Sequence, residues 1–281
     1  AELYYDPKRL LPDEDPPGRF LMTGFGIFLE TLSIAANSSN QSVFAEMKDT
    51  FLDSKLEGLQ ILALLTLTPS ASKDTLDRKL ILERRTSRLP YAKREVEKSV
   101  VKELQEIATD FGQTFTFSSE PAVVNWVMKL NCDTMFLDMN DDKARNEVGS
   151  WIRYTTSEAK EKKDGLWAYC MNVGMGAMYL FFHHRWIVNL PGVYQLCQKK
   201  YMSTMEGTST VAWLSGPFDN NADWINSGRM MARLWLTMTK YGVYLHPFGS
   251  IITNDTSHAR LRDKFAFDET TNTMWLIMRL G

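Results

Sequence analysis

The chain has 281 residues, of which 44% are hydrophobic and 23% are charged, a composition typical of a globular protein with a sizeable core. Its formal net charge of −2 excludes a general nucleic-acid binder, because no basic surplus exists to neutralise many phosphates. Any anion site must therefore be local.

The cysteines and histidines show no spacing typical of a metal site or a disulfide scaffold, so we predict no metal centre. Three free thiols suit a reducing compartment, and we expect a cytoplasmic protein. The first residues are no signal peptide. They have the pattern of a strand whose beginning is missing, so we expect the natural chain to begin earlier.

The first eighty residues predict two strands and a buried helix. Residues 2–5 have the pattern of a short strand, and residues 19–36 are apolar almost all round, which is typical of a buried helix. Gly24 and Gly26 each cost about 1 kcal/mol relative to alanine in a helix, so we expect another backbone to pack closely against them. The unbroken apolar run at 58–68 predicts a central strand.

The rest of the chain alternates between helical and extended patterns. Pro90 is expected to start a helix that continues to about Phe111, and further helices are predicted at 122–139 and 223–241. Strands are predicted at 113–118, 209–215, 243–245 and 273–280. This interleaving predicts an α+β fold in which helices cover the faces of a sheet.

Residues 166–182 carry no charge and are rich in methionine and aromatic side chains. A membrane span usually needs about 20 apolar residues, and this run is shorter, contains one asparagine and two glycines, and is bounded by charges. We prefer a lid over a ligand pocket, because such side chains adapt to flat ligands. A plain core helix is a close alternative, an interfacial membrane helix ranks lower, and a transmembrane helix ranks lowest.

A basic segment stands out before Pro90. Arg84, Arg85 and Arg88, with the hydroxyls of Thr86 and Ser87, fall within five residues. Guanidinium groups bind phosphate oxygens bidentately, and hydroxyls add hydrogen bonds to the same oxygens. A solvated basic loop is the competing interpretation, since charge runs usually lie on the surface.

A second candidate segment follows the predicted strand at 243–245. It comprises His246, Pro247, Phe248, Gly249 and Ser250. Proline and glycine redirect the backbone, and amides released from a strand ladder can point at a ligand. Taken alone, the segment is an ordinary loop, and its histidine suits a structural hydrogen bond better than proton transfer.

Together these segments resemble the FMN-dependent nitroreductase family, and in particular its single-chain branch with two tandem halves (Acg-like). The basic segment matches the family's Arg-Arg-Ser/Thr-x-Arg flavin motif, with Tyr91 where an aromatic residue is usual. Four other stretches are similar to the family in the expected order: residues 6–19, 222–236, 241–247 and 274–281. Two family features are absent, namely a Ser-x-x-Asn-x-Gln-Pro-Trp type of segment, which we expect before residue 1, and a basic tail after Gly281.

The resemblance implies two pseudo-equivalent sheet-plus-helix halves with flavin at their interface. The first half would be residues 1–80, incomplete at its start, and the second residues 81–281, with a lid insertion at about 155–205. Arg84–Arg88 would hold the ribityl phosphate and the pyrimidine edge of FMN, where a cation stabilises the charge of the reduced flavin. The loop from Pro247 to Ser250 would present a backbone N–H to N5, and His246 is counted with it among the cofactor-binding residues.

The function implied is an FMN-binding oxidoreductase that passes hydride from NADH or NADPH to a small acceptor, such as a nitroaromatic, a quinone or an enone. The alternative is a flavin-sequestering protein with a capped site and little turnover, and a third hypothesis is a membrane-associated module without flavin, resting on residues 166–182. We assign no catalytic residue. We expect no nucleic-acid partner, and either a monomer with pseudo-dimeric halves or a homodimer.

Overall fold

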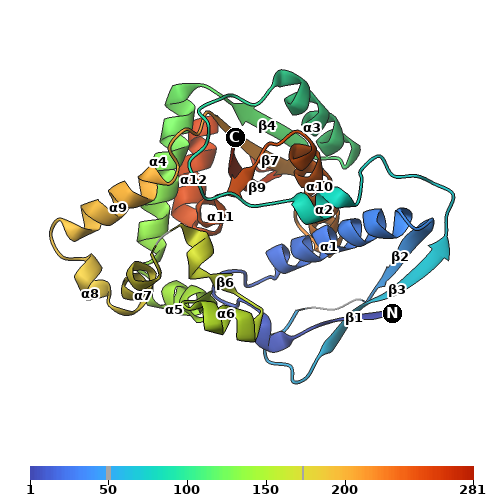
Figure 1. Ribbon diagram of the computed structural model, residues 1–281, viewed down its shortest axis with the longest axis horizontal. Coiled ribbons are helices and arrows are strands. Elements are labelled where there is room, and N and C mark those ends of the chain that lie inside the picture. Colours follow the sequence, from blue (N-terminus) through green and yellow to red (C-terminus); the bar gives the residue numbers. More distant parts are fainter. Residues whose placement is uncertain (49–51, 173) are drawn as a thin grey trace.

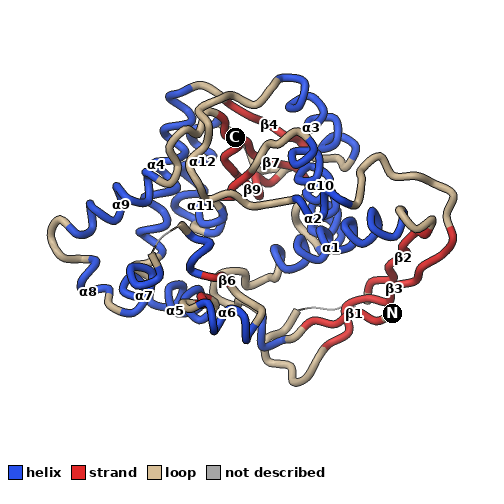
Figure 2. The backbone as a smooth tube through the Cα atoms, in the orientation of Figure 1, coloured by secondary structure: helices blue, strands red, loops and turns tan. Residues whose placement is uncertain are grey.

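The computed structural model describes residues 1–48, 52–172 and 174–281 and contains both helices and sheets (Figures 1 and 2). Its centre is a four-stranded antiparallel sheet in the order β4-β7-β9-β8. The strands are β4 (Thr114–Ser118), β7 (Thr210–Gly216), β8 (Leu245–Pro247) and β9 (Thr273–Leu280). The mixed α+β architecture predicted from the sequence is therefore confirmed.

Helices cover both faces of this sheet because β7 is apolar on both of its faces. Ala212 and Leu214 pack with α3 (Lys98–Asp110) and α10 (Asn221–Lys240). Val211 and Trp213 point the other way, toward α4 (Pro121–Asp138), α11 (Gly249–Thr253) and α12 (Asp255–Phe265). Successive side chains of a strand alternate between faces, so one buried strand serves two cores.

The N-terminal part forms a second, three-stranded antiparallel sheet in the order β1-β3-β2. It comprises β1 (Glu2–Tyr5), β2 (Gln41–Met47) and β3 (Gln60–Pro69), and the 3₁₀ helix η1 (Pro7–Arg9) follows β1. The sheet extends away from the central sheet and packs on α1 (Arg19–Asn37) (Figure 1). The strands predicted at 2–5 and 58–68 are confirmed, whereas β2 was not predicted.

The α1 helix joins the two sheets by packing against α10. A Cβ atom on Gly26 would collide with the carbonyl group of Ile225, whereas one on Gly24 would meet nothing within 4 Å. The prediction of close backbone packing is therefore right for Gly26 and wrong for Gly24. Buried Glu30 accepts hydrogen bonds from Arg229 (2.8 Å) and Arg233 (2.6 Å) of α10. By length and composition α1 could also span a membrane.

A helical region between residues 139 and 205 lies to one side of the central sheet (Figure 1). Two short parallel strands pair within it, and Ile152, Ala168 and Met178 form a small separate core. The elements are α5 (Asp142–Ser150), β5 (Ile152–Arg153), α6 (Thr156–Lys162), β6 (Leu166–Trp167), η2 (Ala168–Met171), α7 (Met175–His183), α8 (Arg185–Val188) and α9 (Val193–Ser203).

Three predicted elements differ from the structure. The helix expected from Pro90 begins only at Lys98, because the Tyr91 N–H donates to the Glu206 carbonyl (2.8 Å) and the preceding stretch crosses the molecule as a loop. The strand expected at 243–245 lies at 245–247, since the Val243 N–H still bonds to the end of α10. Residues 166–182, apart from residue 173, which lies outside the described range, form a strand, a 3₁₀ turn and α7 rather than one helix.

The helix α2 (Lys79–Glu83) precedes the basic segment and completes the order of elements. The equivalence of residues 1–80 and 81–281 as two related halves, with a flavin between them, stays a prediction.

Candidate functional site

The two segments singled out in the sequence lie side by side at the edge of the central sheet. Thr86 forms a parallel bridge with Leu245 of β8, and the Ser87 N–H donates to the Leu245 carbonyl at 3.1 Å. This pairing brings the basic segment next to His246. The structure thus places close together two segments that are far apart in the sequence.

The three arginines of the basic segment have different surroundings. Arg84 stacks over the Trp235 ring, with its guanidinium carbon 4.0 Å from the ring centroid. Arg85 uses Nη1 to donate to the carbonyls of Leu82 (2.6 Å) and Arg84 (2.8 Å). Arg88 is partly buried, burial lowers its pKa, and within the described residues it has neither a hydrogen bond nor an ion pair.

A second buried cation, Arg279 of β9, lies behind the basic segment. Its Nη2 donates to the carbonyls of Ser87 (3.3 Å) and Leu89 (3.0 Å), and its guanidinium carbon lies 4.2 Å from the centroid of the Tyr91 ring. Its Nη1 donates to Thr208 Oγ1 at 3.2 Å. These neutral groups satisfy its donors and hold the basic segment, and no carboxylate neutralises its charge in the described part of the chain.

His246 completes this group as a neutral side chain. It pairs with Arg279 across β8 and β9, and its Nδ1 accepts a hydrogen bond from Arg279 Nε at 3.3 Å. Burial, together with the positive charges of Arg279 and Arg88, lowers the pKa of His246 to about 3. The imidazole is therefore uncharged near neutral pH, and the net charge of the group comes from the two guanidiniums.

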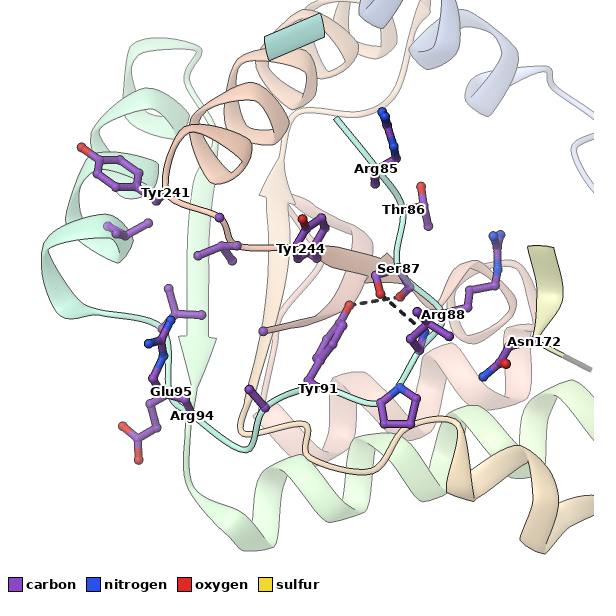
Figure 3. A pocket seen from close by; sticks show the side chains of 18 of the residues that line it. Arg85, Thr86, Ser87, Arg88, Tyr91, Arg94, Glu95, Asn172, Tyr241 and Tyr244 are labelled. Atoms are coloured by element: carbon purple, nitrogen blue, oxygen red, sulfur yellow. Dashed lines mark hydrogen bonds between the residues drawn. The ribbon is translucent and has the colours of Figure 1, made fainter. Parts of the chain in front are cut away.

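A cavity of about 940 Å³ opens along the basic segment (Figure 3). Residues 85–92 form one wall and residues 241–244 another, and Tyr169, Cys170 and Asn172 border it from the helical region. In Figure 3 the Tyr91 and Tyr244 rings lie between these walls, and a dashed line marks the bond from the Tyr91 hydroxyl to the Ser87 carbonyl, which is 3.1 Å long. Burial raises the pKa of Tyr91 to about 12. The lining is thus basic along residues 85–88 and aromatic at the tyrosines, and Glu95 and Glu97 add two carboxylates to it.

None of the five residues of the predicted loop, His246 to Ser250, lines this cavity. Phe248 is buried in the core under α11, and its N–H donates to the Ile277 carbonyl at 2.8 Å. Pro247 has no N–H, so only Gly249 and Ser250, at the start of α11, could offer an amide to a ligand. The role predicted for this loop at flavin N5 stays a prediction.

Sequence reasoning missed Arg279. A signal for Arg279 was present, because one arginine interrupts the apolar strand Thr273–Leu280 and a buried arginine needs a specific reason. The lid predicted at residues 166–182 includes Tyr169, Cys170 and Asn172, which border the cavity. That this segment acts as a lid stays a prediction.

Metal chemistry has no support in the described residues, because no group of three or more histidine, cysteine or acidic side chains there is placed to hold an ion. Cys132, Cys170 and Cys197 are free thiols. Burial raises the pKa of Cys132 to about 11, which makes it a poor nucleophile. The cytoplasmic location inferred from the thiols stays a prediction.

Comparison with known proteins yields matches only among solved structures. No family model matches the sequence, and no curated protein does. The FMN and NADPH-dependent nitroreductase NfnB from Sphigopyxis sp. strain HMH is 12% identical, with 72% of this chain and 86% of that chain covered and a TM-score of 0.41. The FMN-dependent nitroreductase NfnB from Mycobacterium smegmatis, in complex with NADPH, is 15% identical, with coverages of 72% and 85% and a TM-score of 0.41.

A BluB-like flavoprotein from Clostridium difficile 630 is similar to the same degree, with 11% identity, coverages of 73% and 88%, and a TM-score of 0.40. All three similarities are distant. The ligand of the present chain therefore has to be inferred from its own residues.

Proposed function

We propose that this protein binds FMN in the cavity beside residues 85–91 and acts as an oxidoreductase of the nitroreductase type. Hydride would come from NADH or NADPH and pass to a small acceptor such as a nitroaromatic, a quinone or an enone. The observation that carries the proposal is Arg88 in the wall of this cavity, which has no hydrogen bond or ion pair among the described residues and acts, like Arg279, on the neutral His246.

Uncompensated positive charge at a cavity favours an anionic ligand. Charged side chains removed from water are normally paired, and a partly buried guanidinium without a carboxylate is stabilised by a bound anion. A phosphate monoester or the electron-rich edge of a flavin supplies such a charge. The Arg88 guanidinium can offer either of them two parallel N–H groups.

The dimensions and lining of the cavity also fit a flat cofactor. About 940 Å³ lies at the upper end of the range of roughly 300–1,000 Å³ found for small-molecule sites. Tyr91, Tyr169 and Tyr244 offer aromatic surface, and Val96 and Val243 offer aliphatic surface. A large ligand with an aromatic body and a negatively charged end would find complementary groups at both ends.

The chain's own residues would position this ligand. Arg279 fixes the Ser87 and Leu89 carbonyls and so holds the backbone that carries Arg88. His246 accepts a hydrogen bond from Arg279 Nε. Because His246 is neutral, it does not reduce the positive potential of the two guanidiniums. When bound, FMN supplies the hydride chemistry, and the protein supplies binding, orientation and electrostatic stabilisation.

Replacement of Arg88 tests the proposal directly. Loss of charge-assisted hydrogen bonds worth about 1.5–3 kcal/mol predicts that Arg88→Ala binds FMN roughly ten- to a hundredfold more weakly, measured by quenching of flavin fluorescence. Arg88→Lys should restore only part of the affinity, because the planar fork is lost. Arg260→Ala, an exposed arginine on α12, is the matched control and should bind like wild type.

Two outcomes contradict this assignment. Wild-type protein that takes up no FMN after reconstitution would exclude the flavin site. Equal FMN affinity in wild type and Arg88→Ala would favour the competing interpretation, in which the basic segment is a solvated loop.

A flavin-sequestering function is the second candidate, and the position of residues 169–172 favours it. Tyr169, Cys170 and Asn172 border the cavity from a region separate from the basic segment, as a cap would. A fixed cap would exclude nicotinamide, whereas a movable one would admit it. We therefore expect the FMN-loaded oxidoreductase to lose flavin absorbance when mixed with NADPH in a stopped-flow instrument.

The cap hypothesis predicts a different result in the same assay. The loaded wild-type protein would resist NADPH yet be reduced by dithionite, and Tyr169→Ala would react faster with NADPH than wild type. Failure of both proteins to react with NADH or NADPH would count against the oxidoreductase while leaving FMN binding intact.

A further inference from the structure

The helical region exposes an unusual amount of apolar surface. On α7, α8, α9 and their connections, six large side chains are exposed by at least two fifths of their area. We call this surface the apolar end of the molecule; it comprises Met175, Tyr179, Leu180, Trp186, Leu190 and Leu196. Trp186 is 67% exposed and Leu196 is 66% exposed. Large apolar side chains exposed in this number on neighbouring helices indicate an interaction site.

The outward face of α7 shows that this exposure is systematic. Met178 points inward to the small core, whereas Met175, Tyr179 and Leu180 point outward. On an ordinary surface helix the outward positions would be polar or charged. In sequence and in space, α7 is followed by α8 and α9, which form the end of the molecule opposite to β2 and β3 (Figure 1). The exposed residues thus come from three neighbouring helices.

The charge of this part of the chain has only one sign. No aspartate or glutamate occurs between Asp164 and Glu206, whereas Arg185, Lys199 and Lys200 do. Arg185 is held by Asn140 (2.7 Å) and by Asp142 (3.5 Å). Lys199 and Lys200 are exposed and have no ion pair within the described residues. The apolar end therefore carries a basic rim with no acidic residue of its own.

We propose that the apolar end docks on a membrane surface that contains anionic lipids. Helices with exposed leucine, tryptophan and methionine side chains and accompanying lysines bind in the plane of the lipid interface, and basic residues are attracted to anionic headgroups. Tyrosine and tryptophan are the side chains most favoured at that interface. A second copy of the chain is a poorer partner, because two basic rims would then face each other. Residues 165–205 contain no acidic side chain that could neutralise the opposing rim.

Sedimentation with vesicles tests the proposal. The wild-type protein should co-sediment with vesicles of phosphatidylcholine and phosphatidylserine, more weakly with phosphatidylcholine alone, and more weakly again when salt is raised. Trp186→Ser and Leu196→Ser should each lower the affinity for both vesicles by about tenfold. Replacing both Lys199 and Lys200 by Gln should lower affinity for the anionic vesicles by roughly ten- to thirtyfold and leave binding to phosphatidylcholine nearly unchanged.

Matched controls lie outside the helical region. Leu82→Ser removes a leucine that is 79% exposed, and replacing exposed Lys98 by Gln removes a lysine from α3. Both should bind vesicles like wild type, and circular dichroism checks that every variant is folded. If one of the two serine variants fails to fold, the other carries the test.

Three results would overturn the proposal. They are no sedimentation of wild type with either vesicle, equal losses in Leu82→Ser and Trp186→Ser, and a wild-type dimer that Trp186→Ser converts to a monomer. The last result would assign the apolar end to self-association. FMN titration of the same variants is independent of these results.

Discussion

Replacing His246 by glutamine should make the stability of the protein less sensitive to acid. The imidazole is 9% exposed, lies beside Arg279 and Arg88, and accepts a hydrogen bond from Arg279. Protonation would place a third positive charge in this group and remove the acceptor. A glutamine amide oxygen can still accept from Arg279 Nε but does not titrate.

The magnitude follows from the lowered pKa of His246. The pKa is about 3 in the folded protein and 6.5 for the unperturbed side chain, so between these values the unfolded state binds a proton that the folded state does not. The stability that depends on neutral His246 is complete above the unfolded value and is lost as pH falls toward 3. At about pH 5 the wild type should have lost roughly 2 kcal/mol through this residue alone.

Urea denaturation at about pH 8 and about pH 5 measures the effect. The fall in unfolding free energy between the two pH values should be about 2 kcal/mol smaller for His246→Gln than for wild type. Other titrating groups, including buried His258 with its lowered pKa, act in both proteins and cancel in the difference. His183→Gln, at an exposed position of α7, is the control. The same fall in wild type and His246→Gln would refute the assignment of a neutral histidine beside the two guanidiniums.

Two further predictions concern packing and a buried carboxyl group. Gly26→Ala should destabilise the protein by about 1–3 kcal/mol in urea, because its Cβ would force α1 from the α10 backbone, whereas Gly24→Ala on the same helix should be neutral or stabilising by up to about 1 kcal/mol. Burial raises the pKa of Glu14 to about 7, and the nearby carboxylates of Asp138, Glu147, Asp141 and Asp13 act in the same direction. The stability that depends on protonated Glu14 is therefore present below 4.5, the pKa of the unperturbed side chain, and is lost as pH rises through 7. After allowance for solvent screening, Glu14→Gln should be more stable than wild type by about 1–2 kcal/mol at about pH 8 and similar to it at about pH 4.5, and an equal difference at both pH values would contradict this.

The central sheet could be predicted because its strands carry local signals. β9 was predicted with its observed bounds, and β7 was displaced by one residue, since both are largely apolar runs bounded by turn residues. The loop from Pro90 to Glu97 could not be predicted. Its backbone is fixed by distant partners such as the Glu206 carbonyl and Thr208, reached through Tyr91 and Arg279, and such partners leave no trace in local periodicity.

The candidate site was predictable to a similar extent. The density of arginines identified residues 84–88, but it could not show that Arg84 stacks on Trp235 while Arg88 remains without a partner in the described chain. That division depends on which side chains α10 and β8 bring near each guanidinium. Arg279 was overlooked for the same reason, because it lies far from the basic segment in sequence and reaches it only through the pairing of β8 with β9.

The arrangement of Arg88, Arg279 and His246 links stability to ligand binding. The two guanidiniums both act on His246, and neither has a carboxylate partner among the described residues, so their burial carries a desolvation cost in the folded protein. Apolar side chains packed at this edge of the sheet would avoid that cost. Residues that are less stabilising than the alternatives tend to cluster at functional sites. A ligand that binds only the folded state lowers its free energy by RT ln(1 + [L]/Kd), so an anion at Arg88 would offset part of the cost. The same electrostatic imbalance adds to the effect of burial on the pKa of His246, and it is the reason why we propose a negatively charged ligand for the cavity.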